Sequence, residues 1–277
     1  MILAILAFLL ALGLTLYPMI AAKYNASHQS AIHADYEQIL DKTDDAQKKQ
    51  SLEMAHQYNE MLRPGVQEAF SQDLLQWASE DYADQLNIAG NGIMGYVVIP
   101  NIQVNLPIFH GTADSTLAKG VGHLLGSSLP VGGKGTHTVL TGHSGMASQK
   151  MFSDLVDMRI GDVFYLDVLG QRLAYRVTEI HTVLPYETGL LKIESGKDLC
   201  TLVTCTPYGI NTHRLLVRGE RIPYAEPAEE ETIGAENTSA PSTWERQYAK
   251  GVLVGILVVT GFGILLWSIQ LGRKHHA

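Results

Sequence analysis

The sequence predicts a mainly β domain, a closed or nearly closed antiparallel barrel, lying between two apolar chain ends. Between residues 93 and 218, short segments dense in Val, Ile and Thr alternate with glycine-rich connections. This pattern is typical of a barrel rather than an α/β sheet. Helix-forming residues precede it at 35–62 and 72–86. Long uncharged runs lie at both ends of the chain.

The uncharged runs at residues 2–22 and 251–271 are each long enough to cross a bilayer. About 21 residues, each rising about 1.5 Å along a helix, span the roughly 30 Å hydrocarbon core. Arg273 and Lys274 follow the second run and mark its far end as cytoplasmic by the positive-inside rule. The first run lacks a basic leader, which favours a retained anchor over a cleaved signal peptide. We therefore expect a two-pass cell-membrane protein with both termini cytoplasmic and residues 23–250 outside.

Length, charge and local composition predict how the chain is divided into segments. The chain has 277 residues, which suits one catalytic domain with appendages, and its net charge of −8 makes nucleic acid a poor partner. Residues 223–249 are rich in Glu, Ala, Pro, Ser and Thr and form a linker with too little apolar content to fold alone. The predicted segments are an anchor at 1–22, a helical stalk with a possible lid at 23–92, the barrel at 93–222, the acidic linker at 223–249, a transmembrane helix at 250–272 and a basic cytoplasmic tail at 273–277.

The first helical stretch, residues 35–62, has apolar residues at roughly helical spacing. These residues are Ile39, Leu52, Ala55, Tyr58 and Leu62. The simplest interpretation is a solvated stalk that leads off the membrane and ends at Arg63-Pro64-Gly65. A second helix is expected at 72–86.

Segments rich in β-branched residues and bounded by turn signals predict the strands. They are 93–100, 102–108, 137–141, 162–168, 172–184, 200–205 and 214–218. The stretch 163–177, which turns near Gly170-Gln171, predicts a hairpin.

The two cysteines, Cys200 and Cys205, lie in one predicted strand. Five residues of extended chain separate their Cα atoms by about 16 Å, beyond the roughly 7 Å that a disulfide allows. The odd spacing also turns the two side chains to opposite faces. At least one thiol is therefore free. We interpret Cys200 as a small core residue and Cys205 as a candidate nucleophile.

The segment TLVTCTPYGINTHR, residues 201–214, indicates how Cys205 acquires a partner. Cys205 ends one predicted strand, and Arg214 opens the next after a Pro-Tyr-Gly loop. If these strands pair antiparallel, the guanidinium lies within reach of an acyl group on the sulfur. Arginine keeps its charge and offers several donors, so it can favour the thiolate and stabilise a developing oxyanion.

His143, in the segment LTGHSG at the end of another predicted strand, is the candidate proton carrier. An imidazole beside a thiol can protonate the leaving amine in acyl transfer through a thioester. Other histidines are interpreted as ordinary surface or core residues: His110, His123, His137, His181 and His213. No compact ligand spacing is present, so neither a metal nor a cofactor is expected.

These residues strongly resemble the sortases, and in detail the class C, pilus-assembling branch. The segments TLVTCTPYGINTHRLLVRG and LTGHSG are similar to that family, and so are GYVVIPNIQVNLPIFHGT, GVGHLLGSSLPVGGKGTHTVLTGH, FSDLVDMRIGDVFYLDVLGQRLAYRV and VLPYET. The arrangement of anchors at both ends is similar as well. The resemblance covers nearly the whole predicted extracytoplasmic part.

The resemblance implies an eight-stranded sortase barrel and a set of roles. Cys205 would cleave a Leu-Pro-x-Thr-Gly-like sorting motif between Thr and Gly and hold the product as a thioester, with His143 as general acid and base and Arg214 as oxyanion and substrate clamp. A lysine amine of a pilin subunit would resolve the thioester into an isopeptide bond. The partners would be pilin subunits on a Gram-positive cell surface.

One departure from the class C pattern concerns the lid. The family usually carries an Asp-Pro-aromatic motif over the active site, whereas residues 66–71 here are Val-Gln-Glu-Ala-Phe-Ser. The hypothesis is a weaker or more mobile lid in which Glu68 pairs with Arg214 and Phe70 covers Cys205 or His143.

Two alternatives stay open at the level of sequence. A cell-wall-anchoring sortase would use a peptidoglycan amine as acceptor in place of a pilin lysine. A catalytically silent, membrane-tethered barrel would only present a surface to pilins.

Overall fold

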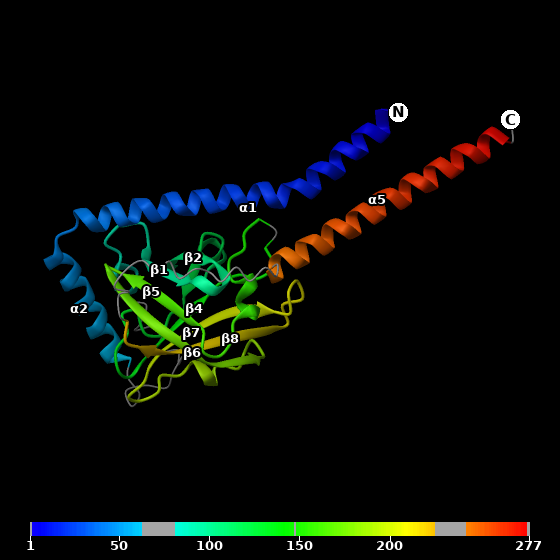
Figure 1. Ribbon diagram of the computed structural model, residues 1–277. Helices are drawn as coiled ribbons and strands as arrows, with labels where there is room; N and C mark the ends of the chain where they lie inside the picture. The colour runs from blue at the N-terminus through cyan, green and yellow to red at the C-terminus, as the bar shows by residue number, and fades with distance from the viewer. Residues whose placement is uncertain (1, 63–80, 147, 225–241, 276–277) are drawn as a thin grey trace.

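The computed structural model describes residues 2–62, 81–146, 148–224 and 242–275. These residues form a closed barrel of eight strands in the order β1-β2-β3-β4-β7-β8-β6-β5, which confirms the predicted eight-stranded barrel (Figure 1). The strands are β1 (Ile93–Ile99), β2 (Val104–His110), β3 (Val121–His123), β4 (Thr136–Thr141), β5 (Val163–Val168), β6 (Gln171–Val183), β7 (Asp198–Thr206) and β8 (His213–Ile222).

The barrel is mixed rather than antiparallel throughout, so that part of the prediction is wrong. β2 pairs with β3 in parallel, and β4 pairs with β7 in parallel. The first parallel pair is joined by a connection that contains the short helix α4 (Asp114–Leu117). The second joins strands that are separated in sequence by the whole β5–β6 hairpin. β3 was not predicted, because three residues are too short to form a recognisable pattern.

The predicted hairpin is confirmed as β5 and β6. Val168 pairs with Gln171, and the pairing continues to Val163 opposite Arg176. Leu169 and Gly170 form the turn with φ of 48° and 81°, the left-handed values that a two-residue hairpin turn needs.

Helices α1 (Ile2–Lys42) and α2 (Asp45–Met61) lie along the barrel, and α5 (Thr243–His275) begins beside it and projects away (Figure 1). The 3-10 turns are η1 (Tyr82–Asp84), η2 (Pro100–Ile102), η3 (Ser153–Asp157) and η4 (Gly189–Leu191). Of the helix expected at 72–86, residues 81–86 instead contain η1, and residues 72–80 lie outside the described part.

The stretch 35–62 is not one solvated stalk. Helix α1 ends at Lys42, and α2 begins at Asp45 after Asp44, whose extended backbone occupies the N-cap position. Both helices bury apolar side chains against the barrel: Tyr36, Leu40, Leu52, Ala55, Tyr58 and Leu62. The free energy of burying this stripe holds the stretch on the barrel rather than in solvent.

Helix α1 and helix α5 leave the barrel in the same general direction, and the two chain termini lie on one side of the molecule (Figure 1). As far as the helices are described, none combines the length and apolar character that a bilayer crossing requires. The two predicted membrane spans therefore stay predictions, as do the segment boundaries. The lid residues Glu68 and Phe70 lie outside the described residues.

Two histidines are part of the barrel wall. His123 and His137 are fully buried, and burial lowers the pKa of each to about 4. His137 Nδ1 lies 2.8 Å from the Lys192 carbonyl oxygen, and Nε2 lies 2.7 Å from the Thr201 hydroxyl. Because the carbonyl can only accept, a neutral ring with its proton on Nδ1 satisfies both contacts. The interpretation of these two histidines as structural is confirmed.

We expect His137→Gln to reduce the loss of stability in acid. The unfolded imidazole takes up a proton near pH 6.5, about the ordinary value, whereas the folded one stays neutral down to about pH 4. The stability contribution is thus complete above about pH 6.5 and falls toward pH 4, by up to about 1.4 kcal/mol per pH unit. Urea unfolding at several pH values in this window gives the free energy of unfolding as a function of pH. Its slope against pH should be shallower for the variant than for the wild type. Equal slopes for the variant and the wild type would contradict this reasoning.

Candidate active site

Cys205 and Arg214 are directly opposite one another on neighbouring strands. β7 and β8 pair antiparallel, with Cys205 opposite Arg214 and Thr204 opposite Leu215. Residues directly opposite in an antiparallel pair have Cβ atoms about 4.5–5.5 Å apart on the same face of the sheet. The pairing of Cys205 with Arg214 across neighbouring strands is therefore the one that the sequence predicted.

The loop between these strands, residues 207–212, is called the cysteine loop below. The amides of Ile210 and Asn211 both donate to the Pro207 carbonyl at 3.0 Å, and Gly209 and Asn211 have φ of 74° and 63°. Such left-handed residues let a short chain reverse. The tight reversal keeps the ends of β7 and β8 together.

The guanidinium of Arg214 bonds to the backbone at the end of the same loop and the start of β8. Its Nη1 donates to the Asn211 carbonyl at 3.2 Å and to the His213 carbonyl at 3.1 Å. Both bonds come from one of the three guanidinium nitrogens. Arg214 itself is partly exposed, so its charged head can meet a bound substrate.

His143 lies just beyond the end of β4, which is the other neighbour of β7. Thr141 pairs with Val203, the Gly142 amide donates to the Val203 carbonyl at 3.0 Å, and the Thr204 hydroxyl donates to the Gly142 carbonyl at 2.8 Å. Continuing this parallel register by two residues brings His143 to the level of Cys205. The structure thus gathers the three predicted residues at one end of three adjacent strands.

Residues 142–152 are called the histidine loop below; residue 147 lies outside the described part. Phe152, at the end of this loop, packs back against its beginning. Phe152 is fully buried, and its amide donates to the His143 carbonyl at 3.0 Å. Gly142 lies directly against the ring, because a Cβ there would be 2.7 Å from Phe152 Cδ2. A glycine at this position allows the ring to sit under the loop.

The sheet face that carries Cys205 continues into a small apolar cluster outside the main core. Its buried members are Val139, Leu191, Val203 and Leu216. Val203 and Leu216 lie two residues from Cys205 and Arg214 on the same strands and pair with each other. Buried apolar packing thus lies next to the reactive end of β7.

The two cysteines differ as predicted. Both are free; Cys200 is fully buried in the core and Cys205 is partly exposed. Burial, with Asp198 adding to it, raises the pKa of the Cys200 thiol well above its ordinary value. Cys200 is therefore an inert core residue, and Cys205 is the thiol that a substrate can reach.

Over the described residues, no group of three or more His, Cys, Asp or Glu side chains could hold a metal ion. A cleft of about 440 Å³ does lie between α1 and the start of α5, but it is lined by neither Cys205, His143 nor Arg214.

The sequence reasoning missed the residues that support the histidine loop from α5, above all Trp244. The signal that could have located the start of this helix is Ser242-x-x-Glu245 directly before the apolar run, the pattern of a capping box. The contacts of that turn with the loop are not readable from the sequence.

We expect Gly142→Ala to destabilise the fold by about 1–3 kcal/mol, because the added methyl group overpacks the site against Phe152. Gly189→Ala is the matched control, since a Cβ at Gly189 meets nothing within 4 Å. That control should stay within about 0.5 kcal/mol of the wild type. Urea unfolding of both variants is the measurement, and equal effects would contradict the close packing of Gly142 on the ring.

Comparison with known proteins identifies relatives over the barrel and the helices. Residues 97–222 match the family model described as a Sortase domain. The crystal structure of Streptococcus pneumoniae sortase C covers 71% of this chain and 99% of its own, at 41% identity and a TM-score of 0.64. That of Streptococcus agalactiae sortase C1 covers 69% of this chain and 98% of its own, at 42% identity and a TM-score of 0.63.

A curated relative agrees with these structures. Sortase A of Streptococcus agalactiae serotype III (strain NEM316) is 31% identical over 131 residues, which are 46% of this chain. This chain spans about half the length of that relative, 52%. Sortases are cysteine transpeptidases, so the predicted enzyme class is confirmed at the level of the family. The barrel and its near-complete overlap with solved class C enzymes show that this chain belongs to the sortase family.

Proposed function

We propose that this chain is a pilus-assembling cysteine transpeptidase that cleaves a Leu-Pro-x-Thr-Gly-like sorting motif and joins it to a lysine amine of a pilin subunit. The observation that carries the proposal is the pairing of Cys205 with Arg214 across β7 and β8, with His143 at the adjoining end of β4. A thiol, an imidazole and a guanidinium at one edge of a sheet are sufficient for acyl transfer.

In the first half of the proposed reaction, the thiol proton of Cys205 passes to His143, and the thiolate Sγ attacks the carbonyl carbon of the motif's threonine. The threonine–glycine amide bond breaks, His143 gives a proton to the departing glycine amine, and the acyl group stays on sulfur as a thioester. Arg214 donates hydrogen bonds to the carbonyl oxygen as negative charge develops there.

In the second half, an acceptor amine attacks the thioester carbonyl. His143 takes the proton that the amine loses, the carbon–sulfur bond breaks, and the thiolate of Cys205 is released. The product is a new amide, which is an isopeptide when the amine belongs to a lysine. No metal or cofactor is required at any step.

One comparison supports a pilin-type substrate. The solved Streptococcus pneumoniae sortase C is described in connection with pilin substrate specificity, and it is similar to this chain over 71% of the chain's length.

We also propose that residues 2–22 and 251–271 anchor the chain in the cell membrane, with the barrel outside and both termini cytoplasmic. The support is the absence of charge in both runs and the basic residues after the second. In intact cells that carry the chain, a membrane-impermeant thiol reagent should label the wild type and not Cys205→Ala. Labelling that requires cell lysis would contradict this topology.

For the enzymatic activity, the full chain is incubated with a sorting-signal peptide and hydroxylamine. We expect a peptide hydroxamate, because hydroxylamine intercepts the thioester, and we expect its rate of formation to fall to background in Cys205→Ala. Cys200→Ala is the matched control and should keep the activity, since Cys200 is buried in the core. Hydroxamate from Cys205→Ala at the wild-type rate would exclude Cys205 as nucleophile.

The same assay separates the alternatives. A pilin with accessible lysines and a cell-wall peptide amine, supplied together at equal concentration, compete for the thioester. Mass spectrometry of the product should find the isopeptide to the pilin in excess. A cell-wall adduct in excess would favour the anchoring sortase, and no product from the intact wild type would favour the silent scaffold.

A further inference from the structure

The histidine loop is held by helices from both ends of the chain. Trp244 Nε1 in the first turn of α5 donates to the Met146 carbonyl at 3.2 Å, three residues after His143. On the α1 side, Asn25 Nδ2 donates to the Ser148 carbonyl at 3.0 Å. Both bonds end on main-chain oxygens of the loop, so they fix its backbone rather than one side chain.

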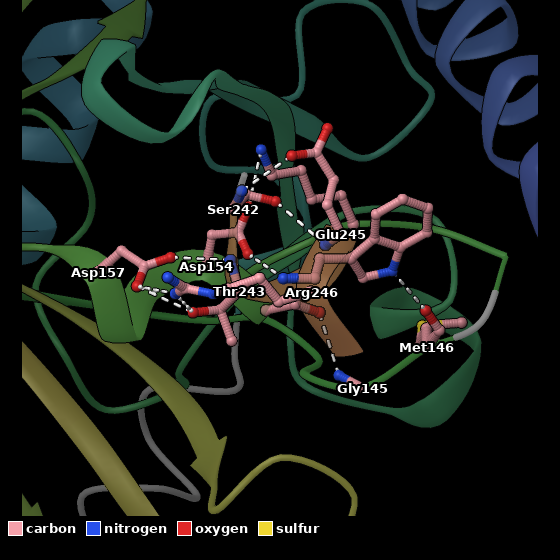
Figure 2. Close-up of polar contacts among 11 residues, drawn as sticks. Gly145, Met146, Asp154, Asp157, Ser242, Thr243, Glu245 and Arg246 are labelled. Atoms are coloured by element: carbon pink, nitrogen blue, oxygen red, sulfur yellow. Dashed lines mark hydrogen bonds and ion pairs between the residues drawn. The ribbon is translucent and has the colours of Figure 1, made fainter. Parts of the chain in front are cut away.

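The first turn of α5 is itself rigidly built. Ser242 and Glu245 form a capping box, in which the Ser242 amide donates to Glu245 Oε2 at 2.8 Å and the Glu245 amide donates to Ser242 Oγ at 3.2 Å. The amides of the two residues between Ser242 and Glu245 donate to carboxylates of η3. Thr243 N donates to Asp157 Oδ2 at 3.0 Å, and Trp244 N donates to Asp154 Oδ1 at 2.7 Å. Figure 2 shows Asp154 and Asp157 facing this turn.

These carboxylates supply partners for amides that a helix start would otherwise leave unpaired. Asp157 also accepts the Thr243 hydroxyl at 2.8 Å and pairs with Arg246 at 3.2 Å. The start of α5 is therefore attached to η3 by several bonds. This attachment sets the position of the Trp244 indole.

Asp154 connects this turn to Lys150 of the histidine loop. Its side chain is fully buried, and it forms an ion pair with Lys150 at 2.8 Å. Burial and, to a smaller extent, the charge of Asp154 raise the pKa of Tyr208, which lies three residues after Cys205. The carboxylate therefore bonds both to the start of α5 and to the histidine loop.

The two loops also meet directly at Gly145. A Cβ on Gly145 would lie 3.4 Å from Gly209 N and 3.8 Å from the Tyr208 ring, and its φ of 79° favours glycine. The Gly145 amide donates to Ser153 Oγ at 3.0 Å (Figure 2). The position of the histidine loop relative to the cysteine loop thus depends on bonds at Gly145 and Met146.

We propose that Trp244 is a positioning residue for the transpeptidation, its indole holding the histidine loop so that His143 faces Cys205; this rests on the proposed function above. Trp244 lines the cleft between α1 and α5, which none of Cys205, His143 and Arg214 lines. It acts through the Met146 carbonyl, and Ser153 acts on the same loop through Gly145. A small displacement of the imidazole slows an alignment-dependent step and leaves the substrate-binding surface in place.

The test is Trp244→Phe in the full chain, which removes the indole N–H and keeps an aromatic ring. With rates expressed per Cys205 thiol titrated by a thiol reagent, kcat for hydroxamate formation should fall about 5- to 20-fold while KM stays within about twofold. Ser153→Ala should act in the same direction. The double variant should lose less than the product of the two single effects, because both bonds position one loop.

Thr260→Val is the matched control on the same helix, since the Thr260 hydroxyl donates to Ile256 of its own helix at 2.8 Å. It should keep the wild-type kcat. An unchanged kcat in Trp244→Phe, a loss confined to KM, or an equal loss in Thr260→Val would overturn the proposal. Activity that survives in Cys205→Ala would instead overturn the proposed function, so the two failures are distinguishable.

Discussion

The placement of β7 between β4 and β8 is the constraint on which the rest of the site depends. Antiparallel pairing sets Cys205 opposite Arg214, and parallel pairing brings the chain that leads into His143 to the same edge. A slip of one residue in β7 would turn Cys205 toward the interior and expose the opposite face. The buried residues Cys200 and Leu202 oppose such a slip, because it would remove them from the core. Core packing and placement of the nucleophile are therefore set by one register.

The helices also help to fix the positions of the loops next to the barrel. Helix α1 and helix α2 bury a continuous apolar stripe on the barrel, whereas the first turn of α5 bonds to η3 and to the histidine loop. The loops of an enzyme are generally its least stable parts, and they need support to hold catalytic groups in line. Here the support comes from segments at opposite ends of the sequence. The proposed membrane anchors and the proposed active site would then be mechanically connected through Trp244 and Asn25.

Local patterns predicted most of the fold, and long-range contacts account for what they missed. The β5–β6 hairpin was predictable because Gly170 and the flanking β-branched residues act locally. The parallel pairing of β4 with β7 was not, because it joins segments more than fifty residues apart by backbone bonds that leave no sequence pattern. The break between α1 and α2 had a local signal in Asp44, but the burial that turns this stretch onto the barrel depends on the barrel. Likewise Cys205 and Arg214 were predictable from one short segment, whereas the contact between Trp244 and Met146 depends on the folded chain.

The account's central claim is that the end of β7 carries the nucleophile that forms a thioester. The most direct measurement is acid quenching of the full chain with a sorting-signal peptide, followed by intact mass and peptide mapping. The account predicts one acyl group per chain, attached to Cys205 and released by hydroxylamine, and its accumulation should be slowed by His143→Ala. An acyl group mapped to Cys200, or no adduct while the peptide is cleaved, would contradict it.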